Sequence, residues 1–91
     1  MKVKMKITAI VPVFNEEKTI KNVLTTLIKS KIIDDIIVVN DASTDGSLKK
    51  IKSLKSKKLK IISLKKNLGK SDAVKIAIKN LKTEILFFYL K

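Results

Sequence analysis

The sequence predicts an α/β fold, a Rossmann-like parallel sheet with the element order β-α-β-α-β-α-β. Apolar runs of strand length alternate with longer segments whose apolar residues recur every three or four positions, as in helices that bury one stripe. Residues 36–39 are four consecutive β-branched residues, which is typical of a strand covered by helices on both faces. Short connections and right-handed crossovers then favour the strand order 3-2-1-4.

The first strand and helix are predicted within residues 7–28. Residues 7–13 are a largely apolar run in which Pro12 is tolerated because it lies near the end of the strand. Asn15 is predicted to cap the next helix, and Glu16 and Glu17 complement the positive end of its dipole. The predicted buried stripe of this helix contains Ile20, Val23, Leu24, Leu27 and Ile28.

The remaining elements continue the same alternation. A second strand is predicted at 36–40, and a helix that begins with hydroxyl residues is predicted at 43–54. A strand at 59–64, a loop at 65–70, a helix at 71–82 and a final strand at 85–90 follow. No helix covers the final strand, so either something absent shields it or the domain is cut short, and its edge offers a route to self-association.

The composition excludes several kinds of chemistry. The 91 residues, enough for one small domain, contain no cysteine and no histidine, which excludes disulfides, thiolate chemistry and imidazole ligands or bases. No apolar run approaches the roughly 20 residues that a membrane-spanning helix needs. We therefore expect a cytoplasmic protein or one at the cytoplasmic face of a membrane.

The net charge of +13 is carried by 21 basic residues, all of them lysine. This charge fits either solvated lysine-rich faces or attraction to a polyanion or an anionic membrane surface. Arginine, whose planar fork clamps phosphates and bases, is absent, and aromatic residues are scarce. Nucleic-acid recognition is therefore disfavoured.

Polar side chains gather where the predicted strands end, at the edge where open α/β sheets bind ligands. Phe14 can stack on a flat ring, Asp41 can accept hydrogen bonds from amide or imide N–H groups, and Lys70 at a helix start favours a phosphate. Simpler roles exist: Asp41 can brace a turn, and Phe14 can pin a loop. No glycine-rich phosphate-binding motif is present. The residues alone predict a nucleotide-binding α/β domain.

Three stretches together resemble a known family. Residues 7–17, 36–45 and 67–70, with Ala73, are similar in order and spacing to the N-terminal half of family 2 glycosyltransferases with the GT-A fold. Within that family they look most like the branch of polyprenyl-phosphate or dolichyl-phosphate sugar synthases. The resemblance covers almost the whole chain, so residues 1–91 are expected to be the N-terminal nucleotide-sugar-binding part of an incomplete, truncated GT-A domain.

The resemblance implies a site for a UDP- or GDP-linked sugar. In that family the first motif lines the nucleoside pocket with an aromatic ring against the base, and the second motif contacts base or ribose. Asn40, Ala42 and Ser71 stand where the family more often has Asp, Gly and Gly. The nucleotide-binding residues predicted for this chain are Pro12, Phe14, Glu16, Val39, Asp41 and Lys70.

The resemblance also implies a metal that this sequence does not hold. The family's fourth strand normally leads to an Asp-x-Asp signature that binds Mg²⁺ or Mn²⁺ and, through it, the diphosphate. Tyr89, Leu90 and Lys91 occupy those positions here, and they cannot offer hard anionic oxygens to a divalent cation. We therefore predict no metal ligand and no catalytic residue in this chain, which alone would be inactive.

The leading hypothesis is thus the donor-binding portion of a glycosyltransferase that transfers a sugar to polyprenyl phosphate or a glycan, with Mg²⁺ or Mn²⁺ in the complete enzyme. Two alternatives remain. One is a non-catalytic nucleotide-binding module, and the other is a lysine-rich module that binds polyanions and whose affinity would fall steeply with salt.

Overall fold

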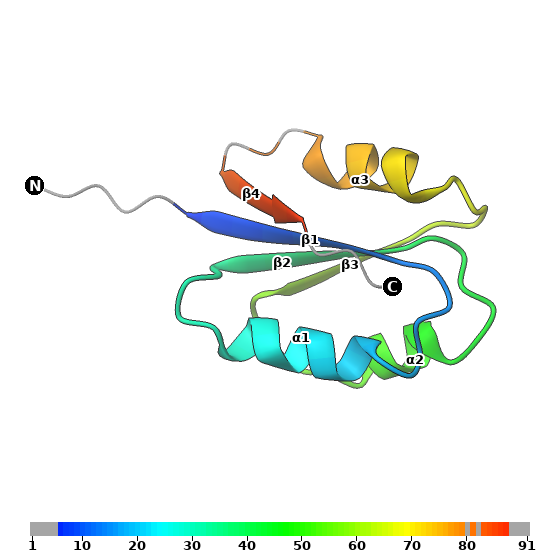
Figure 1. Cartoon of the computed structure of the whole chain (residues 1–91), viewed down its shortest axis with the longest axis horizontal. Helices are drawn as coiled ribbons and strands as arrows, with labels where there is room; N and C mark the ends of the chain where they lie inside the picture. Colours follow the sequence, from blue (N-terminus) through cyan, green and yellow to red (C-terminus); the bar gives the residue numbers. More distant parts are fainter. Residues whose placement is uncertain (1–5, 80, 82, 88–91) are drawn as a thin grey trace, which may run out of the picture.

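A four-stranded parallel sheet forms the centre of the molecule (Figure 1). The computed structural model describes residues 6–79, 81 and 83–87. The strands lie in the order β3-β2-β1-β4, which confirms the predicted fold class and strand order. The elements are β1 (Ile7–Val13), α1 (Ile20–Lys29), β2 (Asp35–Asn40), α2 (Ser47–Lys52), β3 (Leu59–Ser63), α3 (Lys70–Ile78) and β4 (Glu84–Phe87).

The two central strands, β1 and β2, are buried on both faces. Every residue of β1 after Ile7 is buried, and so is every residue of β2 after Asp35. They pair in parallel with Val11 opposite Val38, while β3, at one edge, has only half-buried and exposed residues. The continuous β-branched run therefore lies where helices cover both sides, as such runs do in parallel sheets.

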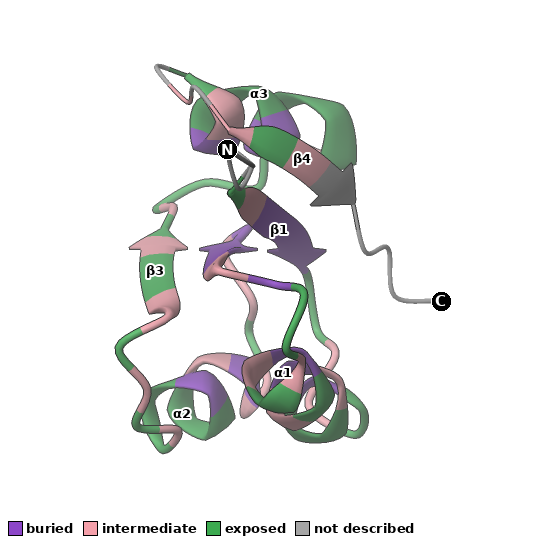
Figure 2. Ribbon diagram, turned by 90° about the vertical axis from the view of Figure 1, so that its left-hand side faces the viewer, coloured by how far each residue is buried: buried purple, intermediate pink, exposed green. Residues whose placement is uncertain are grey.

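Helices α1 and α2 cover one face of the sheet and α3 covers the other (Figure 2). On the α1/α2 face, large side chains such as Ile20, Leu24 and Ile51 are fully buried. On the α3 face the helix contributes Ala73, Val74 and Ala77 to a smaller cluster. The core is therefore thicker beneath α1 and α2 than beneath α3.

Two helices begin later than the sequence predicted. Asn15 does not cap α1, which starts at Ile20, because the backbone of Asn15 is left-handed with φ 53° and its side chain reaches the neighbouring loop. The helix predicted from residue 43 starts at Ser47 instead. Residues 43–46 are not helical because they form hydrogen bonds with the loop after β1.

The C-terminal elements are shorter than predicted where the structure describes them. Helix α3 runs from Lys70 to Ile78 rather than over 71–82, and β4 covers Glu84–Phe87. The rest of the predicted last strand, residues 88–90, lies outside the described residues. Within the described ranges, no helix has the length and apolar character required to cross a membrane.

Candidate functional site

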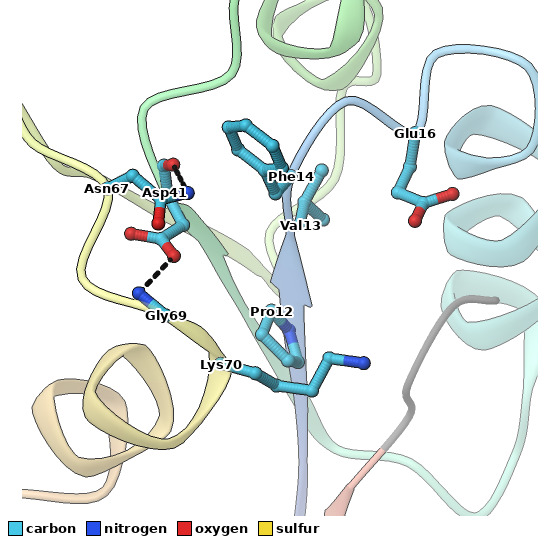
Figure 3. A pocket seen from close by; sticks show the side chains of 8 residues that line it. All are labelled: Pro12, Val13, Phe14, Glu16, Asp41, Asn67, Gly69 and Lys70. Carbon is cyan, nitrogen blue, oxygen red and sulfur yellow. Dashed lines mark hydrogen bonds between the residues drawn. The ribbon is translucent and has the colours of Figure 1, made fainter.

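A pocket of about 350 Å³ opens at the carboxyl end of the sheet (Figure 3). This size falls at the lower end of the range for small-molecule sites. Three segments distant in the sequence meet there: the end of β1 with its following loop, the end of β2, and the loop that leads into α3. Its lining residues are Pro12, Val13, Phe14, Glu16, Asp41, Asn67, Gly69 and Lys70.

One side of the pocket is apolar and aromatic. Pro12 is buried in β1 opposite Val39 of β2, and Phe14 follows the last residue of the strand. The Phe14 side chain is 46% exposed although it is a large apolar residue. Its ring stands at the pocket in Figure 3, where it offers a face to a flat ligand.

The end of β2 supplies a carboxylate. Asp41 is only 3% exposed, and its N–H donates to the Val13 carbonyl at 2.8 Å. Its Oδ1 accepts from the Leu68 N–H at 2.7 Å and its Oδ2 accepts from the Gly69 N–H at 2.9 Å. Asp41 thus braces the third loop as well as lining the pocket.

The third wall combines a glycine, an amide and a cation. Gly69 has φ 89° and ψ 158°, a conformation that is essentially restricted to glycine. This geometry directs the chain from the loop into α3, whose first residue is Lys70. The exposed Lys70 side chain extends beside Pro12 in Figure 3, and Asn67 lies next to Asp41. The pocket therefore has a positive charge at one side.

Glu16 lies apart from the other acidic residue. Figure 3 shows Phe14 between Asp41 and Glu16. The Glu16 N–H donates to the Ser47 Oγ at 2.8 Å, which ties the loop after β1 to the start of α2. Glu16 also lines a second, neighbouring cavity together with Asn15, Glu17, Lys18, Thr19 and Asp45.

Asn15 joins the loops that follow β1 and β2. Its Oδ1 accepts from the Thr44 N–H at 2.7 Å and from the Asp45 N–H at 3.2 Å. Its own N–H donates to the Ser43 Oγ at 3.0 Å. The helix cap that the sequence predicted at Asn15 is wrong, and the role of Asn15 between the two loops was not predicted. The feature that could have indicated this role is that Asn tolerates left-handed backbone better than most residues, which suits a sharp turn after a strand.

Asp45 is the second anchor between these loops. Its Oδ1 accepts from the Ser47 N–H at 2.9 Å, and its Oδ2 accepts from the Glu17 N–H at 3.3 Å. Burial raises the pKa of the Asp45 carboxyl, but hydrogen bonds from Ser47 and Glu17 outweigh it, so the pKa lies below its ordinary value. In return, Glu17 Oε2 accepts from the Gly46 N–H at 3.2 Å.

The structure brings together five of the six predicted nucleotide-binding residues. Pro12, Phe14, Glu16, Asp41 and Lys70 all line the pocket. The Val39 side chain is fully buried in the cluster beneath α3, so contact of Val39 with a ligand would have to use its backbone. Asn67 and Gly69 line the pocket as well, although only their motif, not their individual roles, was singled out from the sequence.

In the described part of the chain, no group of three His, Cys, Asp or Glu side chains lies close enough together to hold a metal ion. The positions where the resemblance placed an Asp-x-Asp signature, Tyr89 to Lys91, lie outside the described residues. Their side chains, a phenol, an alkyl group and an ammonium, do not suit Mg²⁺ or Mn²⁺. The residues present therefore do not fit a divalent cation.

Curated relatives of this chain are glycosyltransferases. An uncharacterized glycosyltransferase, sll0501, of Synechocystis is 30% identical over 80 residues, which are 81% of this chain and 25% of the relative. The poly(ribitol-phosphate) beta-N-acetylglucosaminyltransferase TarS of Staphylococcus aureus is 34% identical over 89 residues, which are 92% of this chain and 16% of TarS. The chain thus spans a quarter or less of these proteins.

Solved structures share the fold. A mannosyltransferase from Pyrobaculum calidifontis, solved with GDP-Man and Mn²⁺, superposes with a TM-score of 0.83 at 22% identity over 96% of this chain and 28% of its own. Glucosyl-3-phosphoglycerate synthase from Mycobacterium tuberculosis, solved with Mn²⁺, UDP and glucosyl-3-phosphoglycerate, gives a TM-score of 0.73 at 21% identity, covering 93% and 33%. The GT-A fold expected from the sequence is confirmed.

The family model supplies the assignment. The model of glycosyl transferase family 2 matches residues 8–89, and this range includes the three stretches singled out from the sequence, except for Ile7, together with every residue of the pocket. The chain belongs to glycosyl transferase family 2.

Proposed function

We propose that the pocket at the carboxyl end of the sheet binds the nucleoside diphosphate part of a UDP- or GDP-sugar. One observation carries the proposal: an exposed aromatic ring, a buried carboxylate and a lysine from three distant segments line the same pocket. Such a set matches the three chemical parts of a nucleotide, which are a flat base, polar N–H and hydroxyl groups, and a charged diphosphate.

Each residue has a role that its surroundings allow. Phe14 stacks on the base, because its ring is partly exposed beside the pocket. Asp41 and Glu16 accept hydrogen bonds from base or ribose, and Lys70 attracts the diphosphate. Together these contacts bind and orient the donor at the edge of the sheet.

The proposed donor and acceptor are those expected for the family. The similar structures were solved with GDP-Man and with UDP, so we propose a GDP- or UDP-linked sugar as the donor of the whole protein. We propose transfer to polyprenyl phosphate or to a glycan. The name of TarS, a poly(ribitol-phosphate) sugar transferase, supports a polymeric acceptor of the glycan class.

The complete enzyme is proposed to require Mg²⁺ or Mn²⁺, as the Mn²⁺ in both similar structures suggests. Among the residues that the structure describes, no group of three His, Cys, Asp or Glu side chains could hold that ion, and we assign no step to it. The chain alone is therefore proposed to bind a nucleotide sugar without turning it over.

The test is a titration of the 91-residue chain with UDP and with GDP at about 0.15 M salt, in which binding is monitored by ¹H–¹⁵N chemical shifts. We expect saturable shifts at residues of the pocket, and we expect Phe14→Ala and Lys70→Ala each to weaken the binding. Ile32→Ala and Lys75→Ala are the matched controls, because Ile32 is 66% exposed and the Lys75 side chain is 77% exposed, and neither lines the pocket.

Three results would contradict the proposal. In the first, neither nucleotide produces saturable shifts. In the second, the pocket variants bind as well as the controls. In the third, any polyanion binds equally and the affinity collapses with salt, which would support the polyanion-binding alternative.

A further inference from the structure

Asp41 holds a loop in addition to lining the pocket. Its two carboxylate oxygens accept from two consecutive backbone N–H groups, those of Leu68 and Gly69, at 2.7 and 2.9 Å. Its carbonyl oxygen accepts from Asn67 Nδ2 at 3.1 Å. One buried residue at the end of β2 therefore contacts three consecutive residues of the loop before α3.

The loop buries little apolar surface. Residues 65–68 are exposed, and Leu68 keeps 42% of its surface exposed despite its apolar side chain. Upstream, the Leu64 N–H donates to the Asn40 carbonyl at 2.9 Å, at the end of the β-ladder. With so little apolar burial, hydrogen bonds to a carboxylate dominate the local energetics, because they are stronger than those between neutral groups.

The position of this loop sets the position of Lys70. Gly69, whose N–H is bound to Asp41, is immediately followed by Lys70, the first residue of α3. A movement of residues 67–69 away from β2 would displace Lys70 from the pocket that it lines. Each oxygen of Asp41 already accepts one backbone N–H, and each keeps a second lone pair that can accept from base or ribose.

We propose that Asp41 is a positioning residue, which places Lys70 at the nucleotide pocket by fixing residues 67–69. That the ligand is a nucleotide rests on the proposed function. Asp41 then contributes to nucleotide affinity through Lys70, and its substitution weakens the diphosphate side of the site rather than only the contact with the base.

The first test needs no ligand. Asp41→Asn keeps the size of the side chain but leaves one acceptor oxygen for two N–H groups. We expect amide hydrogen exchange of Leu68 or Gly69 to accelerate about tenfold or more, whereas amides in the middle of β2 keep their wild-type rates. Asp35→Asn, at the opposite end of the same strand, is the matched control and should leave both loop amides unchanged.

The second test is a double-mutant cycle on the affinity for UDP and for GDP. It compares wild type, Asp41→Asn, Lys70→Ala and the double variant. If Asp41 acts by positioning Lys70, its substitution weakens binding severalfold in the wild type and clearly less once Lys70 is alanine, where only its own contact with base or ribose is left to lose. Equal effects in both backgrounds would overturn the inference, because they would mean that Asp41 contributes to binding independently of Lys70.

The outcomes separate this inference from the proposed function. If the loop amides of Asp41→Asn exchange at wild-type rates, the positioning role is wrong, whether or not the chain binds a nucleotide. Absence of nucleotide binding to the wild-type chain overturns the proposed function, while the exchange rates of Leu68, Gly69 and Lys70 still decide whether Asp41 holds the loop and the residue after it. Asp41→Ala serves as a second variant, with circular dichroism to verify that the fold is retained.

Discussion

The two walls of the pocket are held in place in different ways. The first wall, residues 14–17, is joined to residues 43–47 by hydrogen bonds that run in both directions between the two loops and involve Asn15, Glu16 and Glu17. The second wall, residues 67–70, is connected to the end of β2 mainly through Asp41. The first wall is held by a network of residues, whereas three hydrogen bonds that hold the second wall converge on Asp41.

The core also buries larger apolar side chains beneath the first wall than beneath the second. The first wall continues into α1 and α2, which bury large side chains such as Leu24 and Ile51 against the sheet. The second continues into α3, which buries Ala73, Val74 and Ala77. Burial of larger apolar side chains contributes more stability. We therefore expect the first wall to keep its shape and the second to respond when a ligand binds.

The largest expected effect is at Asn15. Asn15→Ala removes the acceptor for the Thr44 and Asp45 N–H groups and places alanine in left-handed backbone. The loss should be about 2–5 kcal/mol, because each of the two hydrogen bonds contributes about 0.5–1.5 kcal/mol and the left-handed backbone costs alanine about 1–2 kcal/mol. The measurement is the free energy of unfolding in urea.

Two variants separate the two causes at Asn15. Asn15→Gly loses the hydrogen bonds but accepts the left-handed backbone, so it should cost less than Asn15→Ala. Asn22→Ala, on the exposed side of α1, should change stability by less than about 0.5 kcal/mol. If Asn15→Ala proves as mild as Asn22→Ala, the network does not hold the first wall.

The second wall should be most sensitive at Gly69. An added Cβ meets no atom within 4 Å, so Gly69→Ala has no clash and its cost comes from the backbone, at φ 89°. We expect a loss of about 1–3 kcal/mol in the urea unfolding experiment, together with faster amide exchange across residues 67–70.

Gly46 offers a matched comparison in the first wall. Its φ of −81° suits any residue, but an added Cβ would lie 2.5 Å from Glu17 Oε2. The Glu17 side chain can move away at the cost of one hydrogen bond, so Gly46→Ala should lose only about 0.5–1.5 kcal/mol. A larger loss at Gly46 than at Gly69 would reverse the comparison between the walls.

The sequence predicted which segments meet at the pocket, but not how the first wall is held in place. The apolar runs determine which residues form strands, and the order of short connections determines the sheet, so the fold and the meeting of Phe14, Asp41 and Lys70 followed from local pattern. The role of Asn15 did not, because a polar residue before an apolar stripe is also the usual sign of a helix cap. Only the contact with residues 43–45, distant in the sequence, distinguishes the two.

The buried position of the Val39 side chain shows a related limit. A residue at the end of a strand next to a pocket can present either its side chain or its backbone to a ligand. Because side chains alternate along a strand, Val39 and Asp41 belong to the same face of the sheet. Val39 lies within β2, in the cluster beneath α3, whereas Asp41 follows the last residue of the strand and lines the pocket. The family resemblance marks the position of Val39 but not whether its side chain or its backbone is available to a ligand.

A smaller, favourable effect is expected at Ala42. Ala42 has φ 61°, a left-handed conformation that glycine adopts without strain. Ala42→Gly should therefore raise the free energy of unfolding by up to about 1 kcal/mol, since relief of strain exceeds the entropy that glycine gains in the unfolded chain. The urea midpoint should shift upward with an unchanged slope. A destabilised variant would mean that the Ala42 methyl group makes contacts worth more than the strain.

The smallest expected effect concerns the pH dependence of the first wall. Hydrogen bonds from Ser47 and Glu17 hold the pKa of the Asp45 carboxyl below its ordinary value of 3.8. A carboxyl with a lowered pKa in the folded state adds stability above its unfolded pKa and loses that contribution as the pH falls through the folded value. Asp45→Asn should therefore be less stable than wild type at neutral pH, and the gap should narrow below pH 3.8.

The measurement is the difference in free energy of unfolding between wild type and Asp45→Asn, taken between about pH 6 and pH 3. Because the same residues are present in both chains apart from Asp45, the titration of the other carboxylates largely cancels in the difference. A difference that stays constant over this range, or widens toward acid, would mean that the carboxylate charge of Asp45 does not hold the two loops together. The first wall would then rest on Asn15 and on Glu16 with Ser47, which carry no such dependence on pH in their hydrogen bonds.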